Sequence, residues 1–253
     1  MRPFHEQLSQ LFQKVVLMGS TAESMIRLAV RTLMERNESL AAECYAREDD
    51  VNRLQVEVDD QAVKLTALQQ PVATDARFLF MASRIGGELE RIADQAINVC
   101  QNAHFVLEAA PLKPMVDLPI MADIVQKMVR DSLSAMVDKN LVLADQVLED
   151  EKKVDAFRDQ IFRTLLTYMM ADPGTIQRAL SLILIARNLE RIGDHATNIC
   201  EEVIYWIQGR DVRHSRPHAP LGPPGTMSNG NTASSHISGS ATSLEREERS
   251  EPQ

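Results

Sequence analysis

The chain contains the same twelve-residue motif twice, 100 residues apart. Residues 89–100 read Leu-Glu-Arg-Ile-Ala-Asp-Gln-Ala-Ile-Asn-Val-Cys, and residues 189–200 read Leu-Glu-Arg-Ile-Gly-Asp-His-Ala-Thr-Asn-Ile-Cys. Eight of the twelve positions are identical. A repeat of this kind indicates two copies of one structural unit. Because 253 residues suffice for two domains of roughly 100 residues each, we expect a chain built from two similar halves.

Both halves show the residue spacing of amphipathic helices, with apolar residues recurring every three or four positions. These spacings predict six helices, over about residues 4–36, 40–69, 74–108, 120–139, 141–170 and 173–208. Asp172 followed by Pro173 predicts the N-cap of the last helix. The repeated motif lies in the third helix of each half, where spacings of four and three alternate as in a heptad seam. Aromatic residues make up only 4% of the chain, which favours helices over strands. The sequence therefore predicts an all-α fold of two tandem three-helix bundles, with six long antiparallel helices.

Proline content and composition mark the boundaries of the two bundles. Three prolines fall within residues 110–119, which indicates a linker. The first bundle then spans residues 1–109 and the second spans residues 120–208. From residue 209 to 253, Pro, Ser, Gly, Thr and Asn dominate and apolar residues are few, so we expect this tail to be disordered.

The net charge indicates which kinds of partner the protein can bind, and the cysteine content indicates the cellular compartment. The formal net charge is −9 and no basic patch is present, which argues against nucleic acid as a partner. The three cysteines, Cys44, Cys100 and Cys200, form no CxxC motif and indicate a reducing compartment. The N-terminus lacks the apolar core of a signal peptide, and the longest apolar run is too short to cross a bilayer. We therefore expect a cytoplasmic protein with no membrane span.

Each copy of the motif carries a polar stripe. A Glu, an Asp and an Asn stand at i, i+4 and i+8, so they share one face of a helix. The stripes consist of Glu90, Asp94 and Asn98 in the first copy and of Glu190, Asp194 and Asn198 in the second. Glu202 extends the second stripe by one step. On a helical wheel both stripes lie opposite the apolar seam, so the sequence predicts that they face outward.

Two interpretations of these stripes remain open. In the first, Arg91 reaches Asp94 at i+3, as Arg191 does Asp194, and the stripes form ordinary exposed ion pairs of little energetic value. In the second, a cation bridges each acidic pair. Two acids at i and i+4 repel each other by roughly a few tenths of a kcal/mol, and a bridging cation explains why both copies retain the pair. Oxygen ligands of this kind suit Mg, Ca, Mn or iron.

Other residues could complete such sites. The preceding helix of each half repeats the spacing of four, with Glu48 and Asn52 in the first half and Glu151 and Asp155 in the second. His195 could add a nitrogen ligand, although the first copy has Gln95 there. Ala93 and Gly193 are small enough either to let an ion approach closely or simply to pack against a neighbouring helix. Cys100 and Cys200 lie next to the seam and are expected to be small core residues.

Motifs for catalysis are absent from the sequence. No histidine follows a Glu at i+3, which a carboxylate-bridged di-iron bundle needs. There is no P-loop, no dinucleotide fingerprint and no nucleophile elbow. We therefore expect no enzymatic activity.

The duplicated Leu-Glu-Arg-Ile-[Ala/Gly]-Asp-x-Ala-x-Asn motif resembles that of the PhoU family of phosphate-transport regulators, as does the segment Leu-Gln-Gln-Pro-Val-Ala-Thr-Asp-Ala-Arg at 68–77. The resemblance covers about residues 4–208. It implies two similar three-helix bundles and multinuclear clusters of iron or another divalent ion, such as Zn, Mn or Mg, on the bundle surface. The family's metal motif maps onto Glu90 and Asp94, and onto Glu190 and Asp194. Ala93 and Gln95 replace the more usual Gly and His, so the second copy fits the family pattern better.

The role implied by this resemblance is regulatory. Family members restrain the phosphate ABC transporter when phosphate is ample, and they help a membrane sensor histidine kinase to hold the starvation response off. They are thought to bridge the transporter ATPase and the kinase, often as homodimers, which would place the protein peripherally at the inner membrane. Two alternatives remain open, namely a metal-free helical adaptor for another transporter and a metal-storage or metal-dependent bundle protein.

Overall fold

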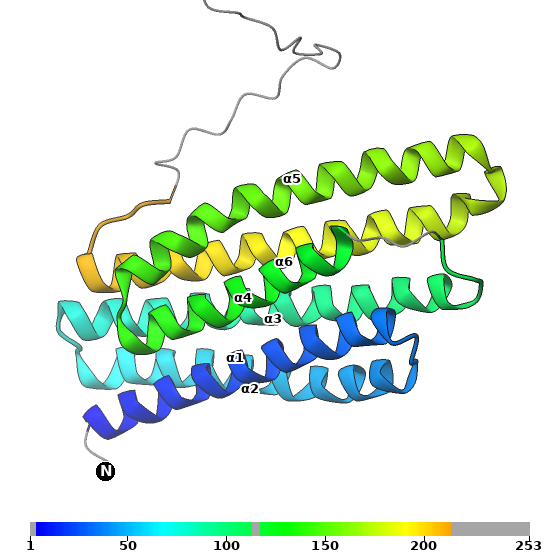
Figure 1. Cartoon of the computed structure of the whole chain (residues 1–253). Coiled ribbons are helices and arrows are strands. Elements are labelled where there is room, and N and C mark those ends of the chain that lie inside the picture. Colours follow the sequence, from blue (N-terminus) through cyan, green and yellow to red (C-terminus); the bar gives the residue numbers. More distant parts are fainter. Residues whose placement is uncertain (1–3, 113–116, 214–253) are drawn as a thin grey trace, which may run out of the picture. The chain divides into compact units, whose positions relative to one another are not determined.

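The computed structural model describes residues 4–112 and 117–213 (Figure 1). Its helices are α1 (Phe4–Met34), α2 (Ser39–Gln69), α3 (Ala73–Leu107), α4 (Asp117–Asp138), α5 (Leu141–Ala171), the short 3-10 helix η1 (Pro173–Thr175) and α6 (Ile176–Gln208). The described residues contain no strand. The predicted all-α fold of two tandem three-helix bundles is confirmed, and each expected helix is present.

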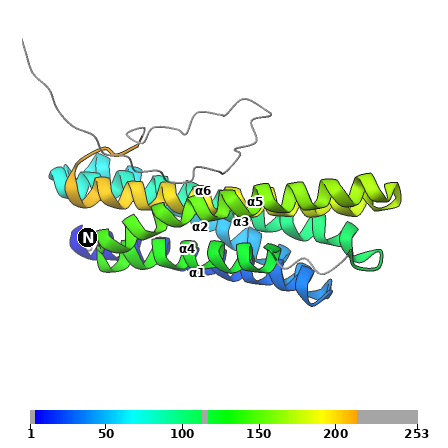
Figure 2. The ribbon, with the colours of Figure 1, turned by 45° about the horizontal axis from the view of Figure 1, so that its top comes forward.

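The six helices form two layers. Helices α2, α3, α6 and α5 lie side by side in this order, because α3 contacts both α2 and α6, and α6 contacts α5. Helices α1 and α4 contact each other and cover one face of this four-helix layer, α1 against α2 and α3, and α4 against α5 and α6 (Figures 1 and 2). The opposite side of the four-helix layer, here called the uncovered face, has none of the described helices packed on it.

The predicted heptad seams form the core between the layers. Their fully buried members include Leu89, Ile92 and Ala96 of α3 and Leu189, Ile192 and Ala196 of α6. Gly19 of α1 lies at a close approach between the two halves. A Cβ built on Gly19 would lie 2.5 Å from Leu133 Cδ2 of α4, so glycine lets α1 and α4 pack together at this point.

Polar caps and special residues set the helix ends. The side chain of Asn140 accepts a hydrogen bond from the backbone N–H of Leu143 at the start of α5. Asp172 accepts one from Gly174 N–H before α6, which confirms the cap predicted at this position. Gly209 has a φ of 67° and ends α6 in the left-handed conformation that glycine adopts without strain.

Two boundaries differ from the prediction. Helix α4 begins at Asp117, inside the segment expected to be linker, because a proline such as Pro119 is tolerated in the first turn of a helix. The first residues of the predicted tail are attached to the bundle, since Arg213 pairs with Glu202 of α6 at 3.1 Å. The rest of that tail, residues 214–253, lies outside the described residues.

Trp206 joins the two halves near the end of α6. Its ring lies 5.5 Å from the ring of Phe78 on α3, and Lys139 Nζ lies 4.6 Å from the centre of the indole. Arg77 Nε donates to the carbonyl oxygen of Trp206 at 3.3 Å. One large side chain thus packs against α3 and against the turn between α4 and α5.

Candidate functional site

The structure groups the predicted acidic residues into two sets, one at the boundary of α2 and α3 and one at the boundary of α5 and α6. The first acidic set consists of Glu48, Glu90 and Asp94, and the second consists of Glu151, Asp155, Glu190 and Asp194. Every member is half-buried. The stripes are less exposed than the wheel predicted, because α3 and α6 each pack against three neighbouring helices and not only along one seam.

Mutual repulsion is evident in the first acidic set. Burial, followed by the charge of Asp94, raises the pKa of Glu48. Burial and Asp94 also raise the pKa of Glu90, against the opposing effect of the Arg91 and His195 charges. Since Glu48 comes from α2 and the other two carboxylates come from α3, the two helices bring like charges together across their boundary.

The carboxylates of the second acidic set also repel one another, but a positively charged side chain, Arg158, lies among them. Burial, and then the charges of Glu190, Glu151 and Asp155, raise the pKa of Asp194 to about 6. Arg158 of α5 donates from Nη1 to Glu190 Oε1 at 2.5 Å and to Asp155 Oδ1 at 3.0 Å. The guanidinium therefore offsets part of the negative charge at this boundary.

The side chains are near one another without forming a ready-made metal centre. Among the residues that the structure describes, no group of three or more His, Cys, Asp or Glu side chains is arranged to hold an ion. Two of the remaining predicted ligands are paired elsewhere or exposed, since Asn198 donates to Glu88 and Asn52 is exposed. Asn98 is half-buried, and its backbone carbonyl, not its side chain, accepts from Asn102 Nδ2. Metal binding stays a prediction, with the two acidic sets as its candidate sites.

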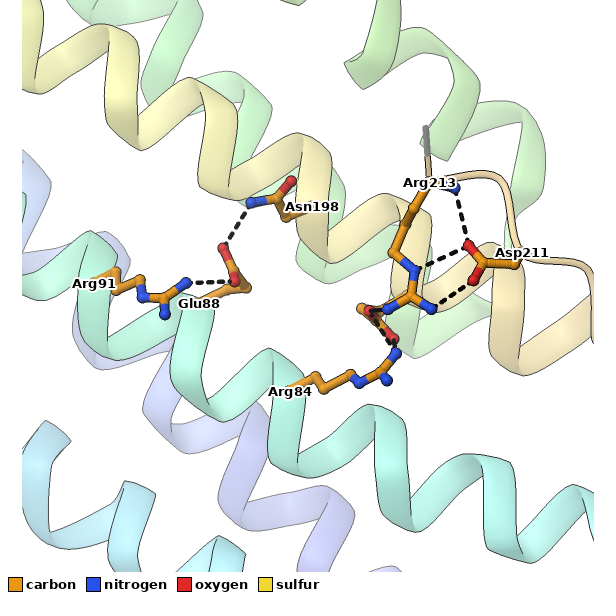
Figure 3. Close-up of polar contacts among 7 residues, drawn as sticks. Arg84, Glu88, Arg91, Asn198, Asp211 and Arg213 are labelled. Atoms are coloured by element: carbon orange, nitrogen blue, oxygen red, sulfur yellow. Dashed lines mark hydrogen bonds and ion pairs between the residues drawn. The ribbon is translucent and has the colours of Figure 1, made fainter. Parts of the chain in front are cut away.

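A polar link between the two halves was missed by the sequence analysis. Glu88 of α3 accepts hydrogen bonds at Oε2 from His195 Nδ1 at 2.8 Å and from Asn198 Nδ2 at 2.9 Å, both on α6. Arg91 pairs with Glu88 at 3.1 Å (Figure 3), and not with Asp94, as the ion-pair interpretation of the stripe had it. Burial would raise the pKa of Glu88, but these partners hold it below its usual value.

Glu202 forms the second link between the halves and takes no part in the second acidic set. Its side chain is buried, and its carboxylate pairs with Arg84 of α3 and with Arg213, each at 3.1 Å (Figure 3). A difference between the two copies marks the two carboxylates, although it does not identify their partners. Glu88 and Glu202 occupy positions where the other copy has Asn188 and Asn102, so these carboxylates belong to the junction and not to the repeat.

The small residues of the motif face the core. A Cβ on Gly193 would lie 3.6 Å from Met128 Cε and 3.7 Å from Val154 Cγ1, which is ordinary packing distance. Ala93 is fully buried at the matching position. These contacts support the packing interpretation of the pair. Cys100 and Cys200 are buried, as expected of small core residues, and Cys44 is buried as well.

Comparisons with known proteins agree with this architecture. The model of the PhoU domain family matches residues 15–103 and again residues 118–203. The crystal structure of PhoU from Pseudomonas aeruginosa superposes with a TM-score of 0.79 at 35% identity, covering 82% of this chain and 100% of that one. The regulatory protein PhoU from Streptococcus pneumoniae gives a TM-score of 0.76 at 21% identity, over 83% of this chain and 99% of that one, and shares the fold.

Curated sequences give the same result. A PhoU homolog from Zymomonas mobilis is 35% identical over 211 residues, which cover 83% of this chain and 89% of the relative. PhoU from Escherichia coli is 33% identical over 213 residues, covering 83% of this chain and 88% of the relative. The protein is thus one of the duplicated helical-bundle proteins that carry an acidic motif in each half. It belongs to the PhoU family. None of its described helices is long and apolar enough to span a membrane.

Proposed function

We propose that the protein is a negative regulator of phosphate uptake and of the phosphate-starvation response. Family membership supports this proposal, because the curated relatives are named as accessory proteins of the phosphate-specific transport system. In this role it acts as an adaptor, as a homodimer in the cytoplasm, and contacts the ATPase of the phosphate ABC transporter and the membrane sensor histidine kinase. It reaches the inner membrane through these partners. An adaptor of this kind needs no catalytic group.

We also propose that the two acidic sets bind metal ions, either iron or another divalent ion such as Zn, Mn or Mg. The chemistry of the donors supports this, since both sets offer carboxylate oxygens at a helix boundary. The observation that carries the proposal is the grouping of half-buried carboxylates from α5 and α6. Burial, and then the charges of Glu190, Glu151 and Asp155, raise the pKa of Asp194 to about 6, so it is unfavourable for these groups to be ionised together. A bound cation would offset that repulsion and would connect the two helices of each set.

The regulatory role is tested by a reporter of the phosphate-starvation response, alkaline phosphatase activity, in phosphate-rich medium. Deletion of the gene is expected to turn the reporter on, and expression of the intact chain is expected to turn it off again. A reporter that stays off after deletion contradicts the proposed role and favours a different transporter as the client.

The role of metal is tested with the double variant Asp94→Asn and Asp194→Asn in the same reporter strain. We expect this variant to fold but to lose both metal content and repression. Full repression without bound metal would favour the metal-free adaptor. Redox turnover or accumulation of many ions by the purified protein would favour the metal-dependent or metal-storage alternative.

A further inference from the structure

A groove runs between α5 and α6 next to the second acidic set. It has a volume of about 510 Å³, and its walls include Phe162 of α5 and Ile183, Arg187 and Arg191 of α6. Glu190 and Asp194 of the second acidic set line the groove together with Asp159, and Arg158 lines it while it pairs with Glu190. The groove therefore has an acidic end, an arginine rim and an apolar floor.

The apolar floor continues along both helices towards the turn that joins them. Exposed large apolar side chains follow at spacings of four, which places them on one side of each helix. They are Phe162, Leu166 and Met170 on α5 and Ile176, Leu180 and Leu184 on α6. Phe162 is 48% exposed and Met170 is 80% exposed. Clustered exposure of large apolar residues on one surface is typical of a binding site.

The arginine rim carries positive charge that the described residues do not neutralise. Arg187 and Arg191 stand at i and i+4 on α6, and both are exposed. Within residues 4–112 and 117–213, neither forms a hydrogen bond or an ion pair, whereas Arg158 is paired with three acids. Like charges at this spacing repel each other, so a carboxylate supplied from outside would be favourable here.

The first half keeps part of this surface, because Val63, Phe80 and Arg91 match Leu166, Leu180 and Arg191, but it differs at three positions that line the groove. Asp59 stands where Phe162 stands in the second half, and Ser83 and Gly87 replace Ile183 and Arg187. Ser83 Oγ donates a hydrogen bond to Asp59 Oδ1 and so joins α2 to α3. The fold therefore does not require these three lining residues, since the other copy of the same unit is built without them.

We propose that the α5–α6 groove is a docking site for an amphipathic helix of a partner protein whose apolar stripe is flanked by Asp or Glu. Two antiparallel helices with an apolar groove between them accept a third helix in the way that a bundle does. The acidic flank pairs with Arg187 and Arg191. The second acidic set repels this acidic flank, so the docked helix extends away from that set, from Arg191 towards Leu180. This proposal goes beyond the proposed function and depends on neither metal nor the identity of the transporter.

The proposal is tested by fluorescence anisotropy with the full chain and two labelled peptides. Each peptide is a helix of about 18 residues, or five turns, with Leu at spacings of three and four. One peptide carries Glu on the flanks of the stripe, and the other carries Lys at the same positions. The protein variants are the double charge reversal Arg187→Glu with Arg191→Glu, and Phe162→Asp. The matched control is Arg27→Glu with Arg31→Glu, which makes the same charge change at the same spacing on α1.

We expect the acidic peptide to bind the unaltered chain at least about tenfold more tightly than the basic one. The double reversal should weaken the acidic peptide about tenfold and strengthen the basic one, because charge complementarity decides between them. Phe162→Asp should weaken both peptides, and the α1 control should change neither. Circular dichroism verifies that each variant is folded.

Several results would overturn the proposal. One is equal affinity for the two peptides, and another is an acidic-peptide affinity that the double reversal leaves unchanged. A third is the conversion of a dimer into a monomer by the double reversal, measured by analytical ultracentrifugation, with no effect on peptide binding. In that case the occupant of the groove would be a second copy of this chain.

Discussion

The two acidic sets come from the same motif but differ in how their charge is balanced. In the second set Arg158 pairs with Glu190 and Asp155. The first set has no such cation from its neighbouring helix, because Gln55 stands at the position that matches Arg158. The residue that makes the two sets differ in charge, Arg158 or its match Gln55, therefore lies outside the repeated motif, on the adjacent helix. A duplicated motif alone does not specify two equivalent sites.

The halves also differ at the end of the third helix, where Trp206 matches Val106 of the first half. We expect Trp206→Ala to lower the free energy of unfolding by about 3–5 kcal/mol, because it removes the ring that packs against Phe78 and Lys139. Val106→Ala should cost only about 1–2 kcal/mol, since a smaller side chain is lost. Urea unfolding measures both values. Equal costs would mean that Trp206 does not hold the halves together.

Removing the charge of Asp194 is expected to give the next largest change in the free energy of unfolding. Because its pKa is raised from 3.8 to about 6 on folding, its ionised form destabilises the fold. This penalty is absent below about pH 4, grows as the pH rises through about 6, and is complete above that value. Asp194→Asn should therefore stabilise the protein by about 1–2 kcal/mol at neutral pH in the presence of a chelator.

The same experiment compares the two sets across the pH range. Stability of the unaltered chain, measured by thermal unfolding between about pH 4 and 7, should fall more steeply with rising pH than that of Asp194→Asn. Glu48→Gln and Glu90→Gln should act in the same direction in the first set, because both groups have raised pKa values. Identical slopes for Asp194→Asn and the unaltered chain would contradict the repulsion inferred here.

Substitutions at Arg158 and Gln55 test directly whether the difference in charge balance between the two acidic sets affects metal binding. Arg158→Gln removes a positive charge from the second acidic set and should strengthen divalent-ion binding there about tenfold, or about 1.4 kcal/mol. Gln55→Arg should weaken binding at the first set by a similar factor. Calorimetric titration with Mn measures each change. If neither substitution alters the affinity, the difference in charge balance has no bearing on metal binding.

The smallest expected effect concerns one of the positions at which the two motifs differ, Ala93 in the first copy and Gly193 in the second. Gly193→Ala should be neutral or stabilising by up to about 1 kcal/mol, because alanine favours the helix and its Cβ would meet Met128 and Val154 at packing distance. Ala93→Gly should destabilise by about 1 kcal/mol for the same reason. Chemical denaturation of both variants provides the measurement, and loss of bound metal in Gly193→Ala would contradict the packing role.

The sequence predicted most of the fold because periodicity and breakers are local signals. The heptad positions Leu89 and Leu189 are buried as expected, and the cap at Asp172 is present. The start of α4 was missed, because Pro119 reads as a breaker although it sits in a first helical turn, where its missing N–H costs nothing. The half-buried position of the stripes was missed as well, since a helical wheel does not show how many neighbours a helix has.

The acidic residues of the site could be predicted, whereas their partners could not. The repeated spacing identified Glu90, Asp94, Glu190 and Asp194 without knowledge of the fold. The pairing of Glu88 with His195 joins residues that lie 107 positions apart, and no local pattern encodes that contact. Arg158 was overlooked for the same reason, because only the packing of α5 against α6 brings it to Glu190.

The layered arrangement has a consequence for amide hydrogen exchange. Helices α3 and α6 each touch three other long helices, whereas α2 and α5 each touch only two. Backbone amides of the central helices α3 and α6 should therefore exchange with deuterium more slowly than those of the outer helices α2 and α5. Each acidic set takes its carboxylates from one central helix and one outer helix. An ion bound there would connect the two helices and lower the amide exchange rate of the outer helix towards that of the central one.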